Sequence, residues 1–126
     1  MINVKVEIFE DKINELIQAQ KMSIESTTND VLEDIKTSAV VPYDTGNLQD
    51  SSSVDLSALD NGVTHIYFDT PYARRLYWHP EFNFRRDKNA NAQGKWMQDY
   101  VDGEKVEFIK EKFKNHLKSN AKGLIK

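Results

Sequence analysis

Binding chemistry is concentrated in one stretch of the chain, residues 71–101, which contains both tryptophans, every arginine and three of the five tyrosines. Tyrosine, tryptophan and arginine give large contact areas and are enriched at the hot spots of protein interfaces. A polar segment of asparagine, alanine and glycine interrupts the stretch at positions 89–94. This composition is typical of a surface that holds a partner, and not of a plain linker.

Catalytic and metal-binding patterns are absent from the sequence. His65, His79 and His116 fall in different expected elements, and no two of them have the spacing of a zinc motif. Acidic residues near His79 do not single out an acid–base site. The 89–94 segment lacks the Gly-Lys-Ser/Thr of a phosphate-binding loop. We therefore expect no metal, no cofactor and no enzymatic activity.

Nucleic acid is the alternative partner, because basic and aromatic residues interleave between positions 74 and 96 as in proteins that bind single strands. The isoelectric point of about 5.6 and the acidic amino half disfavour a broad phosphate-neutralising surface. A single-stranded nucleic-acid binding module that uses residues 71–101 stays open as the second hypothesis. It is equally open that several of these aromatic residues belong to the core beneath solvated arginines.

The sequence predicts two long amphipathic helices, one on each side of residues 71–101, that would position this stretch. Residues 11–36 have apolar side chains at steps of three, four and seven, which predicts a helix. A cluster at Ser26–Asn29 is a weak point of that helix, since Ser, Thr and Asn compete for backbone hydrogen bonds. A second helix, lysine-rich, is predicted from Val106 to about Leu124. The apolar residues of the first helix are Ile13, Leu16, Ile17, Ile24, Val31, Leu32 and Ile35.

The segments between the helices predict a small antiparallel sheet. Strands are expected at 53–57 and 63–69 around an Asp60-Asn61-Gly62 turn. A tight turn is expected at 42–47, a short helix at 72–78 after Pro71, and a loop at 80–95. Alternation at Val4–Ile8 suggests a further short strand. The predicted fold is α+β, with a small antiparallel sheet packed against two long helices in one domain, residues 1–126.

Charge divides the chain into halves of opposite sign. Residues 1–63 carry 4 basic and 12 acidic residues, net −8, and residues 64–126 carry 13 and 8, net +5. One reading is that an acidic helix packs on a basic one; another is that copies attract head to side in a ring, or that the basic half faces an acidic partner. No apolar run approaches the length of a membrane span, so no membrane partner is expected.

Two sequence elements resemble the small minor capsid proteins of tailed phages and prophages of Gram-positive bacteria. The first is Pro-x-Asp-Thr-Gly-x-Leu-x-x-Ser at 42–51, which is common among head-tail connector, neck and tail-completion proteins. The second, more specific to the family, comprises YARRLY at 72–77 and KNxNAxGxW at 88–96. Ala90 departs from the pattern, because a proline is expected between the asparagines. The resemblance spans roughly residues 41–100.

The resemblance implies a virion structural protein, made in the host cytoplasm and assembled at the head-tail interface as a stopper or tail-completion ring. Its expected partners are further copies of itself, about six or twelve in a ring, and the neighbouring connector, portal-side and tail-tube proteins, with DNA passing nearby. The loop from His79 to Lys95 is expected to adapt on assembly. The expected interface residues are Asp44, Thr45, Tyr72, Arg74, Arg75, Tyr77, Trp78, Phe82, Arg85, Arg86, Lys88 and Trp96.

Overall fold

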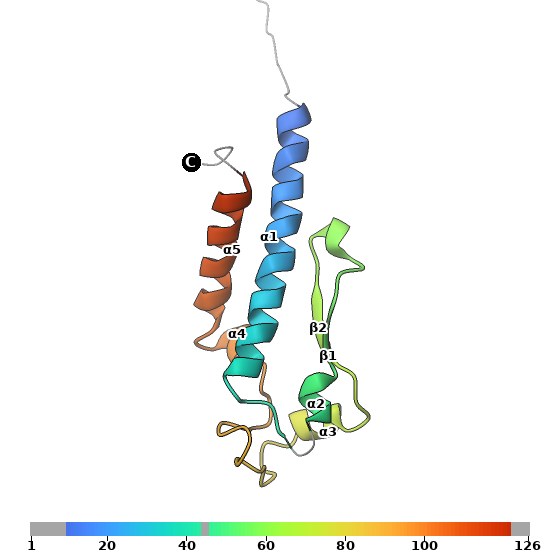
Figure 1. Ribbon diagram of the computed structural model, residues 1–126, viewed down its shortest axis with the longest axis vertical. Helices are drawn as coiled ribbons and strands as arrows, with labels where there is room; N and C mark the ends of the chain where they lie inside the picture. The colour runs from blue at the N-terminus through green and yellow to red at the C-terminus, as the bar shows by residue number, and fades with distance from the viewer. Residues whose placement is uncertain (1–9, 44–45, 122–126) are drawn as a thin grey trace, which may run out of the picture.

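The computed structural model describes residues 10–43 and 46–121 (Figure 1). Helix α1, Glu10–Thr37, runs along most of the molecule. Helix α5, Val106–Ala121, packs along one side of α1, and the hairpin of β1, Ser52–Asp55, and β2, His65–Phe68, lies on the other side. This arrangement confirms the predicted α+β class. The strand expected at Val4–Ile8 lies outside the described residues.

Helix α1 is continuous through the predicted weak point. Its buried residues recur mainly every fourth position, at Ala19, Ser23, Thr27, Val31 and Ile35. The hydroxyl of Ser23 donates to the carbonyl oxygen of Ala19 at 2.6 Å, and that of Thr27 to the carbonyl of Ser23 at 2.6 Å. These bonds satisfy the buried hydroxyls, so polar residues are accommodated without a break.

The apolar face predicted for α1 is wrong at its start. Ile13 and Ile17 were expected to point into the core, but 47% and 41% of their surfaces are exposed. The small residues Ala19 and Ser23 are buried in their place. The periodicity of apolar residues did not predict this shift, because small polar residues such as Ser23 can also be buried where helices pack closely.

The predicted hairpin is confirmed, with shorter strands. β1 and β2 are antiparallel, with Val54 opposite Ile66. Their connection contains the single 3₁₀ turn η1, Leu59–Asn61, which ends at Gly62 with a φ of 75°. The hairpin is fastened to α1 by a 2.6 Å hydrogen bond between the hydroxyls of Thr28 and Thr64.

The core lies at the carboxyl end of α1, where the short elements gather (Figure 1). These are α2, Asn47–Asp50, α3, Ala73–Tyr77, and α4, Gln98–Asp102. The sequence predicted α3 but neither α2 nor α4, since helices of four or five residues have no measurable period. The fully packed core residues are Val31, Ile35, Val41, Leu48, Ala73 and Trp96.

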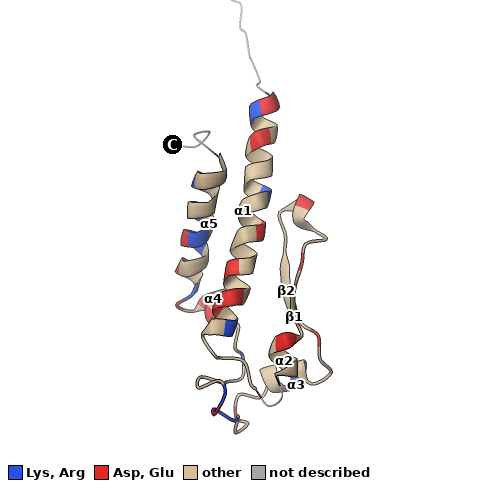
Figure 2. Ribbon diagram, in the orientation of Figure 1, with Lys and Arg blue, Asp and Glu red and all other residues tan. Residues whose placement is uncertain are grey.

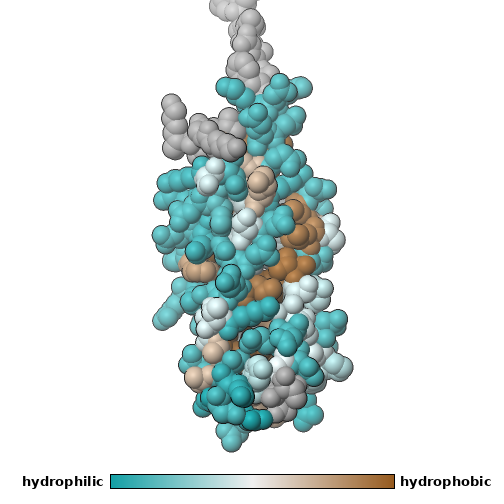
Figure 3. Space-filling model, viewed as in Figure 1, coloured by the Kyte–Doolittle hydropathy of each residue, from teal (hydrophilic) through white to brown (hydrophobic). Residues whose placement is uncertain are grey.

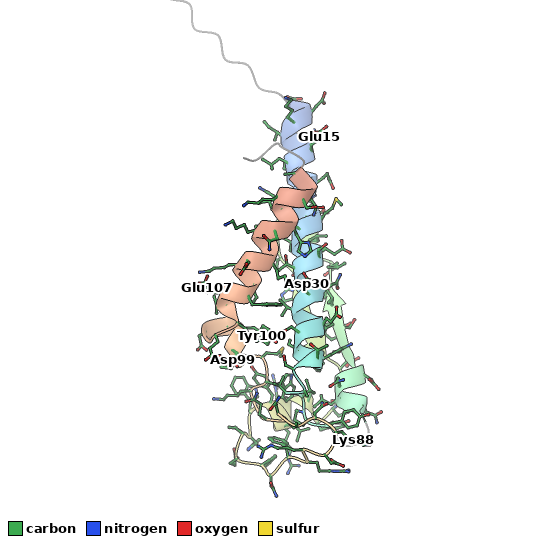
Figure 4. The ribbon with its side chains drawn as sticks, turned by 60° about the vertical axis from the view of Figure 1, so that its left-hand side comes forward. Glu15, Asp30, Lys88, Asp99, Tyr100 and Glu107 are labelled. Carbon is green, nitrogen blue, oxygen red and sulfur yellow. The ribbon has the colours of Figure 1, made fainter. Side chains whose placement is uncertain are left out.

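Polar contacts join α1 to the carboxyl-terminal segment. Asp30, labelled in Figure 4, lies 2.6 Å from the Nε2 of His116, and Asp34 lies 3.0 Å from the Nζ of Lys105. Acidic residues mark α1 and lysines mark α5 (Figure 2), so the packing of an acidic on a basic helix is confirmed for these pairs. His116, on α5, is half-buried in this contact. Within the described ranges, no helix has both the length and the apolar character that a membrane span requires.

Candidate protein-docking interface

Helix α3 presents two arginines from one side and enters the core with the other. Pro71 lies just before Tyr72, the N-cap of the helix. Ala73 is 9% exposed and belongs to the core, with Leu76 half-buried beside it. Arg74 and Arg75 are therefore left exposed, and neither forms an ion pair with a carboxylate among the described residues.

The two tryptophans of the stretch have different roles. Trp96 is 3% exposed, and its ring meets the edges of Phe68 and Tyr77 at centroid distances of 5.4 and 4.9 Å. Trp78 is 59% exposed and has the ammonium of Lys95 5.7 Å from its ring centroid. The interface role expected for Trp96 is thus wrong, because its ring fills the core, whereas Trp78 stays largely exposed.

The asparagines of the 88–96 element hold the loop on the chain that follows α1. Asn89 is 8% exposed, and its Nδ2 donates to the carbonyl of Val41 at 2.8 Å and to the Oε1 of Gln49 at 2.9 Å. The Nδ2 of Asn91 donates to the carbonyl of Ser38 at 3.0 Å. Two backbone N–H groups of this loop, at 91 and 93, also donate to carbonyls at 39 and 40. The second half of the loop, expected to adapt on assembly, is therefore tied to the body of the domain.

Gly94 brings the two ends of the loop together. A Cβ at this position would lie 2.6 Å from the Cα of Pro80, closer than any side chain tolerates. The next backbone N–H, that of Lys95, donates to the carbonyl of Tyr77 at 2.8 Å. These contacts close the loop directly behind α3. The first half of the loop, residues 79–88, forms a compact excursion from this closure.

A groove of about 640 Å³ opens between this excursion, α2 and α3. Its apolar and aromatic lining comes from Pro42, Tyr43, Leu48, Tyr72, Leu76, Phe82 and Phe84, and its positive charge from Arg75 and Arg85. The guanidinium carbon of Arg75 lies 5.6 Å from the centroid of the Phe82 ring. Concave apolar walls with a few convergent cations suit an acidic segment that carries apolar side chains.

Local pairs keep the excursion ordered. The Nη2 of Arg85 donates to Asp87 at 2.7 Å, and this contact lowers the pKa of the Asp87 carboxyl. His79 pairs with Glu81 at 2.7 Å, which lowers the pKa of Glu81, and the His79 ring stacks on Phe82 at 4.8 Å. These carboxylates remain ionised, so they compensate part of the positive charge at this end of the molecule.

The structure brings part of the expected interface together. Tyr72, Arg75, Phe82 and Arg85 line the groove, while Arg74 and Trp78 are exposed on α3 and directly after it. Tyr77 is half-buried against Trp96, and burial raises the pKa of its hydroxyl. Lys88 and Arg86 are exposed on the loop, where the Nε of Arg86 donates to the carbonyl of Ala92 at 3.4 Å. Asp44 and Thr45 lie outside the described residues.

Several groove residues were missed by the sequence reasoning. Pro42, Tyr43 and Leu48 line the groove, and all three belong to the 42–51 element, which the sequence offered only as a motif. Gly46 fits under the Tyr43 ring, where a Cβ would lie 2.9 Å from the hydroxyl oxygen. These residues could have been assigned to the groove only from the proximity of this element to α3, and a single sequence does not reveal such long-range contacts.

No family model, curated protein or solved structure matches this chain. Among residues 10–43 and 46–121, no cluster of histidines and carboxylates has a geometry that could hold a metal ion. The described surface contains an aromatic groove with two arginines in its lining and an exposed tryptophan directly after α3, and tryptophan and arginine are residue types enriched at protein-binding hot spots.

Proposed function

We propose that this chain is a structural protein of a tailed bacteriophage virion, which joins head to tail in the neck as a stopper or tail-completion ring. The observation that supports the proposal is one groove lined from two parts of the family resemblance, by Pro42, Tyr43 and Leu48 of the 42–51 element and by Tyr72 and Leu76 at α3. The 88–96 element closes the loop behind them. All three elements thus serve one surface.

Such a surface suits assembly by docking. Arg75 in the groove lining and Trp78 directly after α3 supply a cation and a large exposed ring, residue types enriched at hot spots. The loop beside them is tied to the domain at several points, so little ordering entropy remains to be lost when a partner binds. A ring built from copies of the chain needs such a preformed surface on every subunit.

The nucleic-acid alternative is supported less well. Single-strand binders stack successive bases on exposed aromatic faces. Here Trp96 is in the core, Tyr77 covers it, and Phe82 stacks on His79. Trp78 and Tyr72 are the aromatic residues of the stretch with exposures of 59% and 40% among the described residues. This leaves few platforms for a strand.

Complementation tests the proposal. In the phage or prophage genome that encodes the chain, deletion of its reading frame should yield DNA-filled heads and separate tails in electron micrographs. The wild-type gene in trans should restore tailed, infectious particles. A gene with Trp78→Ala and Arg75→Ala should fail to restore them, with a loss of at least about a hundredfold in titre if both residues are hot spots of about 2 kcal/mol or more.

The matched control replaces an exposed aromatic and an exposed cation away from the groove, Tyr67→Ala with Lys110→Ala. Both residues are exposed, on β2 and α5. This variant should restore the titre. Full restoration by the Trp78 and Arg75 variant would show that the surface does not dock a neck partner, and normal tailed particles from the deletion itself would contradict the proposed function.

A further inference from the structure

The first turns of α1 have an apolar stripe that nothing in the described fold covers. Figure 1 shows α1 extending beyond both the hairpin and α5 at this end. Ile13 and Ile17 are 47% and 41% exposed there, although they are separated by one helical turn and lie on one face. Apolar side chains on one face of an exposed helix end are free to pack against another apolar surface.

This stripe continues the face of α1 that the hairpin covers. Following Ile17 at steps of three or four come Lys21, Ile24 and Thr28, of which Lys21 pairs with Asp60 at 2.9 Å and Thr28 bonds Thr64. The hairpin ends at this level, and apolar surface follows the boundary between α1 and the hairpin (Figure 3). Ile13 and Ile17 thus lie on the face of α1 that packs against the hairpin, but beyond the point where the hairpin ends.

The first two turns of α1 are acidic overall, because Glu10, Asp11 and Glu15 outnumber Lys12. Glu10 stands three residues before Ile13 and therefore on the same face, whereas Glu15, two residues from each isoleucine, lies on the opposite side of the helix. The groove has the opposite character, with an apolar and aromatic lining and the arginines at 75 and 85. Figure 4 shows that the two surfaces lie at opposite ends of the molecule, with Glu15 near one end and Lys88 near the other.

We propose that the groove receives the first turns of α1 from a second copy of this chain. Ile13 and Ile17 enter the apolar part of the groove between Leu76 and Phe82, and Glu10 pairs with Arg75. This is helix-in-groove recognition, with anchors at spacings of three and four residues. It deepens the proposed function, on which it rests, by naming the partner of the groove. Since different surfaces meet, the contact is heterologous and can repeat from subunit to subunit around a ring.

The absence of cysteine allows a direct test by disulfide trapping. One purified variant carries Ile13→Cys and another carries Asn83→Cys, an exposed position in the groove lining. Mixed and oxidised, they should give a disulfide-linked heterodimer. A single chain with both substitutions should give a ladder of linked subunits, because opposite ends of one molecule are too far apart for an internal disulfide.

The control variant is Met22→Cys, mixed with the same groove variant. Met22 is on the same helix and 55% exposed, but nine residues from Ile13, two and a half turns, so it points to the opposite side. It should give at least about fivefold less heterodimer. Arg75→Glu should lower the Ile13 yield about two- to fivefold, as expected for one exposed ion pair, and Glu10→Arg in the partner should restore it.

Equal yields from the two helix positions, or no heterodimer at the highest soluble concentration, would overturn the inference. Circular dichroism of each variant establishes that it is folded before mixing. The trapping experiment and the deletion experiment can fail separately. If the deletion separates heads from tails but no disulfide-linked dimer forms, only this contact is contradicted. Efficient trapping with a normal deletion phenotype contradicts the neck role instead.

Discussion

At the scale of single residues, burial decides which aromatic side chains of residues 71–101 are available to contact a partner. Trp78 and Trp96 lie in the same stretch, yet one is 59% and the other 3% exposed. The difference depends on Phe68 of the hairpin, which contacts Trp96 across the core. Residue type predicted the aromatic density of the site correctly, but it could not predict this division, because burial is fixed by contacts between distant parts of the chain.

Tyr100 provides a test at this scale. Its hydroxyl donates to a carboxylate oxygen of Asp34, and burial, with the bonded and charged Asp34 second, raises the pKa of the phenol above its ordinary value of 10.0. Replacement by phenylalanine removes this bond to α1. We expect Tyr100→Phe to lower the free energy of unfolding by about 1–2 kcal/mol, measured by urea unfolding at neutral pH. Tyr67→Phe, an exposed tyrosine, should change it by less than about 0.5 kcal/mol.

The pH dependence of that difference follows from the sign of the shift. A phenol whose pKa is higher in the folded than in the unfolded state stabilises the fold fully below pH about 10, the unfolded value, and loses this contribution as pH rises toward the folded value. The gap in stability between wild type and Tyr100→Phe should therefore shrink between pH about 9 and about 11. A constant gap over that range would contradict the assignment of the buried hydrogen bond.

At the scale of elements, the long helices and the hairpin were predictable because each repeats a pattern over many residues. α2 and α4 were not, since one helical turn leaves no period. The loop 79–95 was predicted to be irregular and is irregular, but its attachment was not foreseen. Asn89 bonds Val41 from 48 positions away in the sequence, and such a pairing has no local signature.

Asn89 tests whether this attachment supports the loop. Asn89→Ala would leave the buried carbonyl of Val41 without its side-chain donor and remove the bond to Gln49. We expect a loss of about 1–3 kcal/mol in the free energy of unfolding and faster amide hydrogen exchange in residues 89–95. Asn83→Ala, an exposed position on the same loop, is the control and should leave both quantities near wild type. A stable, equally protected Asn89→Ala protein would refute the attachment.

At the scale of the whole molecule, the two halves of the sequence carry opposite net charge. Only part of this charge is paired within the subunit. Asp30 and Asp34 pair with His116 and Lys105. The arginines of α3 pair with no carboxylate among the described residues, and the acidic start of α1 lies at the far end of the molecule. This remaining charge is available to the contacts between copies that we propose.

The central claim is that the protein resides at the junction of head and tail. Its most direct test is immunogold electron microscopy of purified phage particles with antibodies raised against the chain, on intact virions and on virions with opened necks. The account predicts gold at the head-tail junction and at no other place on the particle. Gold spread along the tail or over the capsid shell, or particles that contain no copy of the protein, would contradict it.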